Sequence, residues 1–164
     1  DARYAHDSHP NMCVKLTKLS NDAFAYEPST TGLCMTNLSA VRSMSCGKGH
    51  VCALTDDGRV FSWGRNDCGQ LGLGDDRHRQ HAELVYTLPT TAGSNDVLMV
   101  ACGGAHTIVA TASNEVFVWG ANDCGQLGLG HALGRNSPQR VEMLKGKGVR
   151  LLAAGGSHSM VYVR

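Results

Sequence analysis

Short apolar runs separated by polar turns recur along the chain. In HVCALTDDGRVFSW, residues 50–63, two runs of β-favouring residues flank Asp57-Gly58, a pair that favours a tight hairpin because glycine supplies the positive φ of the turn. The equivalent turn in the next copy of this pattern is Ser113-Asn114, followed by VFVW. No stretch of ten residues shows a helical period with capping residues. The pattern predicts an all-β chain of short strands.

The nonamer NDCGQLGLG occurs at residues 66–74 and again at 122–130. Aligning the two copies also aligns flanking residues, since Cys46, His50 and Trp63 fall on Cys102, His106 and Trp119. A third copy begins at Val149, where VRLLAAGGSHSM follows the pattern of VLMVACGGAHTI. The segment SNDAFAYE at 20–27 resembles SNEVFVWG at 113–120, which indicates a degenerate unit without the GQLGLG segment.

These matches predict four units. They are a degenerate unit over 1–40, full units over 41–96 and 97–148, and the start of a further unit over 149–164. Units of about 50 residues that contain only strands are more typical of propeller blades than of a helical solenoid. We therefore expect a partial β-propeller of about three blades.

Residues that recur in every unit are interpreted as architecture. Glycine reaches backbone dihedrals that other residues avoid, and the leucines alternating with it, at 71, 73, 127 and 129, should face the layer between blades. The recurring histidines should use one ring nitrogen to hold a neighbouring loop and satisfy buried carbonyls. The predicted structural positions are His50, Trp63, Gly69, Gln70, Gly72, Gly74, His106, Trp119, Gly125, Gln126, Gly128, Gly130 and His158.

The sequence offers few candidates for metal or cofactor chemistry. Cys46, His50 and Cys52 are residue types that zinc prefers, but Ala154 replaces the cysteine in the last unit, so we predict no metal site. GKG at 47–49 and KGKG at 145–148 lack the following Lys-Ser or Lys-Thr and the helix of a phosphate loop. We predict no cofactor.

Catalytic residues are not predicted either. Cys68 and Cys124 belong to no CxxC pair, no basic residue adjoins Cys124, and both are interpreted as small packed residues. Asp67 and Asp123 recur with the fold, which is more typical of architecture than of catalysis.

Net charge limits the classes of partner, and the cysteine content indicates the cellular compartment. Fifteen Lys and Arg against fourteen Asp and Glu give a net charge of +1, which implies neither a membrane nor direct nucleic-acid binding. Seven cysteines, two of them in identical copies of one motif, argue against a secreted disulfide framework. We expect a reducing intracellular compartment, with cytoplasm, nucleus and cilium left open.

Segments that differ between units should carry specificity. DDRHRQHAEL at 75–84 concentrates charge where the next unit has HALGRNSPQR, and 90–96 is a second variable loop. Neither has the interleaved aromatics of a single-strand binder. The candidate binding residues are Arg77, His78, Arg79 and His81. They would meet an acidic partner or DNA phosphates, or belong to an ordinary solvated loop.

The order ACGGAH, hairpin, VFVWGANDCGQLGLG, NSPQRVEML resembles the repeat of the RCC1 family, regulator of chromosome condensation, over residues 41–164. The resemblance implies blades of a seven-bladed β-propeller. It also implies either exchange-factor activity on the small GTPase Ran with nucleosome docking, as in the founding member, or a role in protein interaction. Other members are interaction modules in ubiquitin ligases, kinases, ciliary proteins and a plant UV-B receptor.

Seven such units need more than twice this length, so we expect a piece of a longer propeller. Ala82 also stands where the next unit has the family's Pro138. We predict a non-enzymatic protein-interaction module or scaffold. The alternatives are a guanine-nucleotide exchange factor for a Ran-type GTPase with chromatin association, and a structural component of a ciliary, microtubule or organellar assembly.

Overall fold

The computed structural model describes residues 17–19, 23–25, 40–88 and 97–164. Within these ranges the chain is all-β, with one short 3-10 turn, η1 (Glu142–Leu144), and no α-helix. None of the helical structure in these ranges has the length and apolar character needed to cross a bilayer. The prediction of an all-β chain is confirmed.

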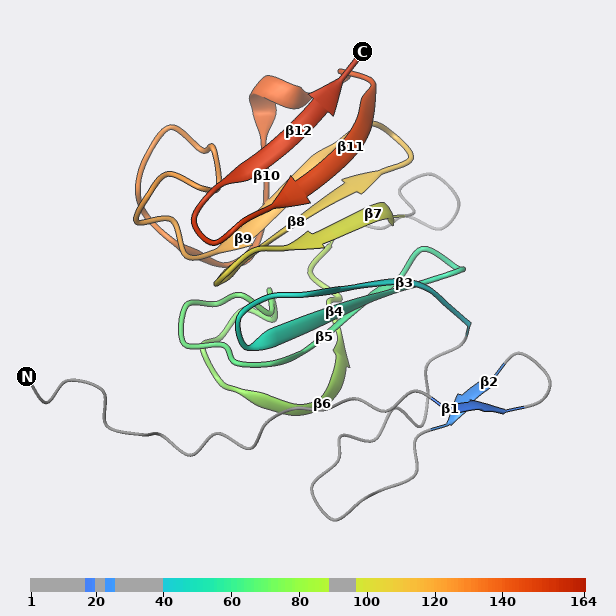
Figure 1. Cartoon of the computed structure of the whole chain (residues 1–164). Helices are drawn as coiled ribbons and strands as arrows, with labels where there is room; N and C mark the ends of the chain where they lie inside the picture. The colour runs from blue at the N-terminus through green and yellow to red at the C-terminus, as the bar shows by residue number, and fades with distance from the viewer. Residues whose placement is uncertain (1–16, 20–22, 26–39, 89–96) are drawn as a thin grey trace, which may run out of the picture.

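Two four-stranded antiparallel sheets form the centre of the molecule (Figure 1). The sheet that we call blade 1 has β3 (Val41–Cys46), β4 (His50–Thr55), β5 (Val60–Gly64) and β6 (Arg79–Leu84) in spatial order. The sheet that we call blade 2 has β7 (Val97–Cys102), β8 (His106–Thr111), β9 (Val116–Gly120) and β10 (Arg135–Arg140). The same up-and-down order of four strands in both sheets is that of a propeller blade.

Two further strand pairs flank these sheets in the sequence. The pair that we call blade 3 is β11 (Val149–Ala154) and β12 (Ser159–Val163), stacked against blade 2 in Figure 1. Near the N-terminus, β1 (Thr17–Leu19) pairs with β2 (Ala23–Ala25); the rest of the predicted degenerate unit over 1–40, and the variable loop 90–96, lie outside the described residues. The described chain is thus a partial β-propeller.

The hairpins form where the turn residues predicted them. Gly58 has a φ of +75° between β4 and β5, and Asn114 has a φ of +60° between β8 and β9. In blade 1 the Thr55 amide donates to the Arg59 carbonyl across the turn at 2.9 Å. Both sequences therefore place a residue that tolerates positive φ at the one position that needs it.

Blade 2 buries both of its faces, one against blade 1 and the other against blade 3. All six residues of β8 are buried, and alternate side chains along the strands of blade 2 point to opposite sides. Val109, Phe117 and Trp119 pack on blade 1 in one core cluster. Ile108 and Val118 pack on blade 3 in another.

The seam between blades 1 and 2 contains a polar contact that we call the seam latch. The backbone oxygen of Gln70 accepts hydrogen bonds from Thr107 Oγ1 at 2.9 Å and from Trp119 Nε1 at 2.8 Å. His50 Nε2 lies 2.9 Å from the same Thr107 hydroxyl. Because that hydroxyl gives its one proton to Gln70, the imidazole must be the donor in its contact with Thr107.

The seam between blades 2 and 3 repeats this arrangement. Ser159 Oγ donates to the Gln126 carbonyl at 2.8 Å and lies 3.0 Å from His106 Nε2. Each histidine therefore contacts a hydroxyl of the next blade, and that hydroxyl in turn donates to the glutamine carbonyl. Contrary to the sequence prediction, the histidines do not bind these carbonyls directly. His158 is exposed. Trp63, the counterpart of Trp119, is fully buried, yet its Nε1 has no hydrogen-bond partner in the described part of the chain.

The two tryptophans provide a matched test of the latch. Replacing either by Phe removes the same atoms, but only Trp119→Phe removes a described hydrogen bond. We expect Trp119→Phe to lower the free energy of unfolding by about 1 kcal/mol more than Trp63→Phe, as measured by urea unfolding followed by circular dichroism. Equal losses would contradict a stabilising role for the Trp119 bond.

A pair of equivalent glycines tests the packing beside the latch. Gly72 has a φ of +73°, and a Cβ there would lie 2.7 Å from Trp119 Nε1. Gly128 has a φ of +64°, with nothing within 4 Å of the added carbon. Alanine costs about 1–2 kcal/mol of backbone strain at both positions, so we expect Gly72→Ala to be the more destabilising by at least about 1 kcal/mol in the same urea assay. A greater loss for Gly128→Ala would refute this packing argument.

Candidate interaction surface

The long loops 65–78 and 121–134 lie at the same end of their blades. Each begins beside the turn between the first two strands of its own sheet. The Arg65 amide donates to the Gly49 carbonyl at 2.7 Å, and the Ala121 amide donates to the Ala105 carbonyl at 2.8 Å. We call this the loop end of the blades.

The repeated nonamer closes on itself within each loop. In blade 1 the Leu71 amide donates to Asn66 Oδ1 at 2.8 Å, and the Cys68 amide donates to Gln70 Oε1 at 2.9 Å. The same two bonds recur at residues 122–127, each at 2.9 Å. Leu71 is fully buried and its carbonyl accepts from Ser62 Oγ at 2.7 Å. The predicted burial of the nonamer leucines is confirmed for Leu71, Leu73 and Leu127, and Leu129 is half-buried against the core.

The two nonamer cysteines, in contrast, were predicted wrongly. Both Cys68 and Cys124 are exposed rather than packed. Their backbone amides are tied to the following glutamine side chains, and the thiols are left on the outside of the loop. Partial burial raises the pKa of the Cys68 thiol, with nearby Asp67 adding to the effect, so this thiol is not activated.

The segment 75–84, predicted as a loop, is largely strand. Arg79–Leu84 forms β6, the outermost strand of blade 1, which pairs with β5 from Gly64↔Arg79 to Phe61↔Leu84. An outermost strand is packed on fewer sides than a central one, so it can keep polar side chains. This polar composition is why the sequence did not predict β6 as a strand.

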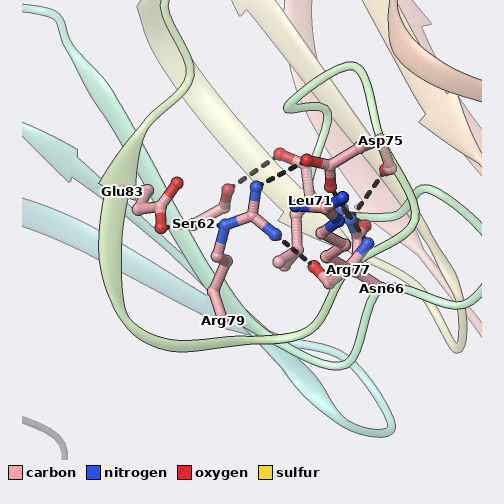
Figure 2. Close-up of polar contacts among 7 residues, drawn as sticks. All are labelled: Ser62, Asn66, Leu71, Asp75, Arg77, Arg79 and Glu83. Atoms are coloured by element: carbon pink, nitrogen blue, oxygen red, sulfur yellow. Dashed lines mark hydrogen bonds and ion pairs between the residues drawn. The ribbon is translucent and has the colours of Figure 1, made fainter.

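Arg79 is the centre of an ion-pair network in this segment (Figure 2). Its guanidinium contacts Asp75 at 2.7 Å and Glu83 at 2.8 Å, and its Nη1 donates to the Arg77 carbonyl at 2.6 Å. The Arg79 side chain is only 17% exposed. The hydrogen bonds from Arg79 and then from the Arg77 amide lower the pKa of Asp75. Arg79 thus holds β6 to the preceding loop and is not free for a partner.

The other three candidate residues differ in their roles. His78 Nδ1 accepts a hydrogen bond from the Asn66 amide at 2.9 Å, so this imidazole also supports the nonamer loop. Arg77 and His81 are exposed. Two arginines against Asp75, Asp76 and Glu83 give this segment a net charge of 2 − 3 = −1 with neutral histidines. The segment is therefore not a basic patch.

A buried cluster of histidine and cysteine lies in the seam between blades 1 and 2. The ligand atoms of His50, Cys52 and Cys102 are all within 4.8 Å of one another. The sequence grouped His50 and Cys52 with Cys46, which the structure leaves exposed. The hydrogen bond between the two buried thiols and their burial raise the pKa of Cys52, whereas that bond lowers the pKa of Cys102.

Comparison with known proteins gives consistent matches. The family model described as "Regulator of chromosome condensation (RCC1) repeat" matches residues 57–110 and 113–162, and a second model of this repeat matches 41–70. The chain is 41% identical over 119 residues to the human probable E3 ubiquitin-protein ligase HERC6, covering 71% of this chain and 11% of that protein. It is 37% identical over 120 residues to the Arabidopsis thaliana ultraviolet-B receptor UVR8, covering 73% and 25%.

Solved structures show the same fold. Human WBSCR16 matches with a TM-score of 0.71 and 28% identity, over 80% of this chain and 33% of that one. Prp20p from Saccharomyces cerevisiae matches with a TM-score of 0.65 and 19% identity, over 85% and 33%. The chain thus spans between 11% and 33% of the length of these four proteins.

The depressed pKa of Asp75 predicts a pH-dependent contribution to stability. Its folded-state pKa lies below the unfolded value of about 3.9, so the contribution is present above that pH and is lost as the pH falls through the folded-state value. We expect Asp75→Asn to cost less than about 1 kcal/mol at pH 7, since the pair is partly exposed, and the cost to shrink progressively as the pH falls below about 3.9. Urea unfolding from pH 7 down to the acid limit of the folded state tests it, with Asp76→Asn as the charge-matched control; a loss that does not diminish as the pH falls would contradict the ion-pair origin.

Proposed function

The chain belongs to the regulator of chromosome condensation (RCC1) repeat family, and we propose that it is a non-enzymatic protein-interaction module of a longer RCC1-type propeller. The observation that carries the proposal is a contrast between two blades. Their sheets and nonamer loops share the same hydrogen bonds, whereas the segments 75–84 and 131–140 differ at nearly every position. A constant scaffold with variable segments is typical of repeat proteins that bind other proteins.

The structural relatives support a protein partner. One solved structure of the yeast protein Prp20p is described with its binding to Gsp1p and histones, and another has Kap60 bound to yeast RCC1. For this chain we infer a protein partner of its own. The near-neutral charge of 75–84 favours a protein over nucleic acid.

The partner surface that we propose is the loop end of blades 1 and 2. Arg77 is exposed in the loop of blade 1, and His81 is exposed on β6, which follows that loop. Leu133 in the equivalent loop of blade 2 is 65% exposed. Arginine is enriched in protein interfaces, and an exposed apolar side chain offers surface that a partner can remove from water.

An extended array is supported by the outer face of blade 3. Met160 and Tyr162 are 64% and 62% exposed, whereas the equivalent Ile108 and Ala110 of blade 2 are buried against the next blade. The same positions that form a seam in blade 2 are therefore available for a further blade.

The surface is tested by a double substitution, Arg77→Glu with His81→Glu, which leaves the Arg79 network in place. Lys145→Glu is the control, because it reverses an exposed charge in the turn after η1 rather than at the loop end. Partners of the wild-type chain are captured by site-specific crosslinking from position 132, an exposed residue in the equivalent loop of blade 2, and quantified by mass spectrometry; all three chains carry the same crosslinker. We expect the double variant to lose its crosslinked partners at least tenfold and the control to retain them; equal recovery from all three chains would contradict this surface.

The rival activities are measured with the same protein. A non-enzymatic module should leave the release of labelled GDP from Ran at its spontaneous rate, whereas acceleration would favour the exchange-factor alternative. Sedimentation with a salt-resistant insoluble assembly would instead favour the structural-component alternative.

A further inference from the structure

The cluster of His50, Cys52 and Cys102 joins two blades. His50 and Cys52 lie on β4 of blade 1, and Cys102 ends β7 of blade 2. Their residues are 1%, 0% and 7% exposed. Among the described residues, these are the three ligand-type side chains that come together in one place. The grouping exists only when the two blades are packed against each other.

The next seam shows that the fold does not need this sulfur. Between blades 2 and 3, Ile108 and Ala154 occupy the positions of Cys52 and Cys102. The contact of His106 with the Ser159 hydroxyl, and of that hydroxyl with the Gln126 carbonyl, is nevertheless retained. The latch and the two thiols are therefore separable features of the seam.

The donor set fits a specific class of ligand. Two sulfur atoms and one imidazole nitrogen are donors that zinc prefers, and tetrahedral zinc sets its ligand atoms roughly 3.5–3.8 Å apart. Separations of at most 4.8 Å require the ligand atoms to approach one another by at most about 1.3 Å. Two thiolates also balance the charge of a divalent ion, so the loaded site adds no net charge to the buried seam.

The imidazole can serve both the latch and a metal. His50 Nε2 now contacts Thr107 Oγ1, and its Nδ1 is buried without a hydrogen-bond partner in the described part of the chain. If a metal takes Nε2, the ring proton moves to Nδ1, while Thr107 Oγ1 keeps its proton donation to the Gln70 carbonyl. The Trp119 bond to Gln70 is untouched. One hydrogen bond is exchanged for a metal–nitrogen bond, and the rest of the latch remains.

We propose that His50, Cys52 and Cys102 form a binding site for a thiophilic divalent metal ion, with Zn²⁺ as the ion that fits the donors, and that the bound ion clips blade 1 to blade 2. The sulfur ligands bind the ion as thiolates, so protons compete with the ion and affinity falls as the pH is lowered. The fourth position is left to water or the Thr107 hydroxyl. Because the folded seam creates the site, the ion binds the folded chain and stabilises it.

The test uses the reduced 164-residue chain and a double variant, Cys52→Ile with Cys102→Ala, which gives the first seam the residues of the second. Each is equilibrated with Zn²⁺ and dialysed, and bound zinc is counted by mass spectrometry. Co²⁺ is used as a visible probe of tetrahedral sulfur ligation. We expect one metal per wild-type chain, a sulfur-to-cobalt absorption band and a rise in Tm of several degrees. The double variant should fold and show none of these.

Two single variants keep the result interpretable. Cys102→Ala should abolish uptake even if the double variant folds poorly, and Cys46→Ser, which removes an exposed thiol outside the cluster, should bind as the wild type does. Equal uptake by the double variant would overturn the proposal, as would loss of binding in Cys46→Ser alone. A wild-type chain that takes up no metal and instead joins Cys52 to Cys102 as a disulfide in air would also overturn it.

Discussion

The polar contacts that align blade 1 with blade 2 converge on a single backbone oxygen, that of Gln70. It lies in a buried seam and accepts hydrogen bonds from Thr107 and Trp119 of the following blade. A buried carbonyl left without donors would cost about 1–3 kcal/mol, so the seam is specific as well as hydrophobic. The nonamer NDCGQLGLG recurs because its own Asn and Gln side chains hold the loop in the shape that presents this oxygen.

The parts of the fold that were predictable depend on neighbours in sequence or on a fixed repeat offset. The hairpins at Asp57-Gly58 and Ser113-Asn114 follow from turn chemistry, and the buried leucines follow from alternation. Contacts across a seam were not predictable in this way. Aligning repeats sets His50 on its equivalent His106, whereas in space His50 meets Thr107 and Cys102. A single sequence shows which residues occupy equivalent positions in the repeats, but it does not show which residues are in contact across a seam.

The candidate surface shows a similar limit. Composition marked Arg77 and Arg79 alike, yet Arg79 is held by two carboxylates and Arg77 is exposed. The spacing of Asp75, Arg79 and Glu83 at intervals of four carried a signal for the ion pairs, but its meaning depends on β6, whose polar sequence does not resemble a strand. The exposure of Cys68 likewise depends on a side-chain hydrogen bond that fixes the loop backbone.

The seam latch also has a direction. One blade supplies the carbonyl and the imidazole, and the next supplies the hydroxyl and, in the first seam, the indole, so the two sides of the contact are unlike. A face that presents the hydroxyl and the indole offers no carbonyl and imidazole to a copy of itself, so two such faces cannot form this contact. Any array extended through this contact must grow head to tail, and such a heterologous contact closes into a ring or continues as an open filament. A twofold-symmetric dimer cannot use it, so symmetric self-association of this protein would have to employ a different surface.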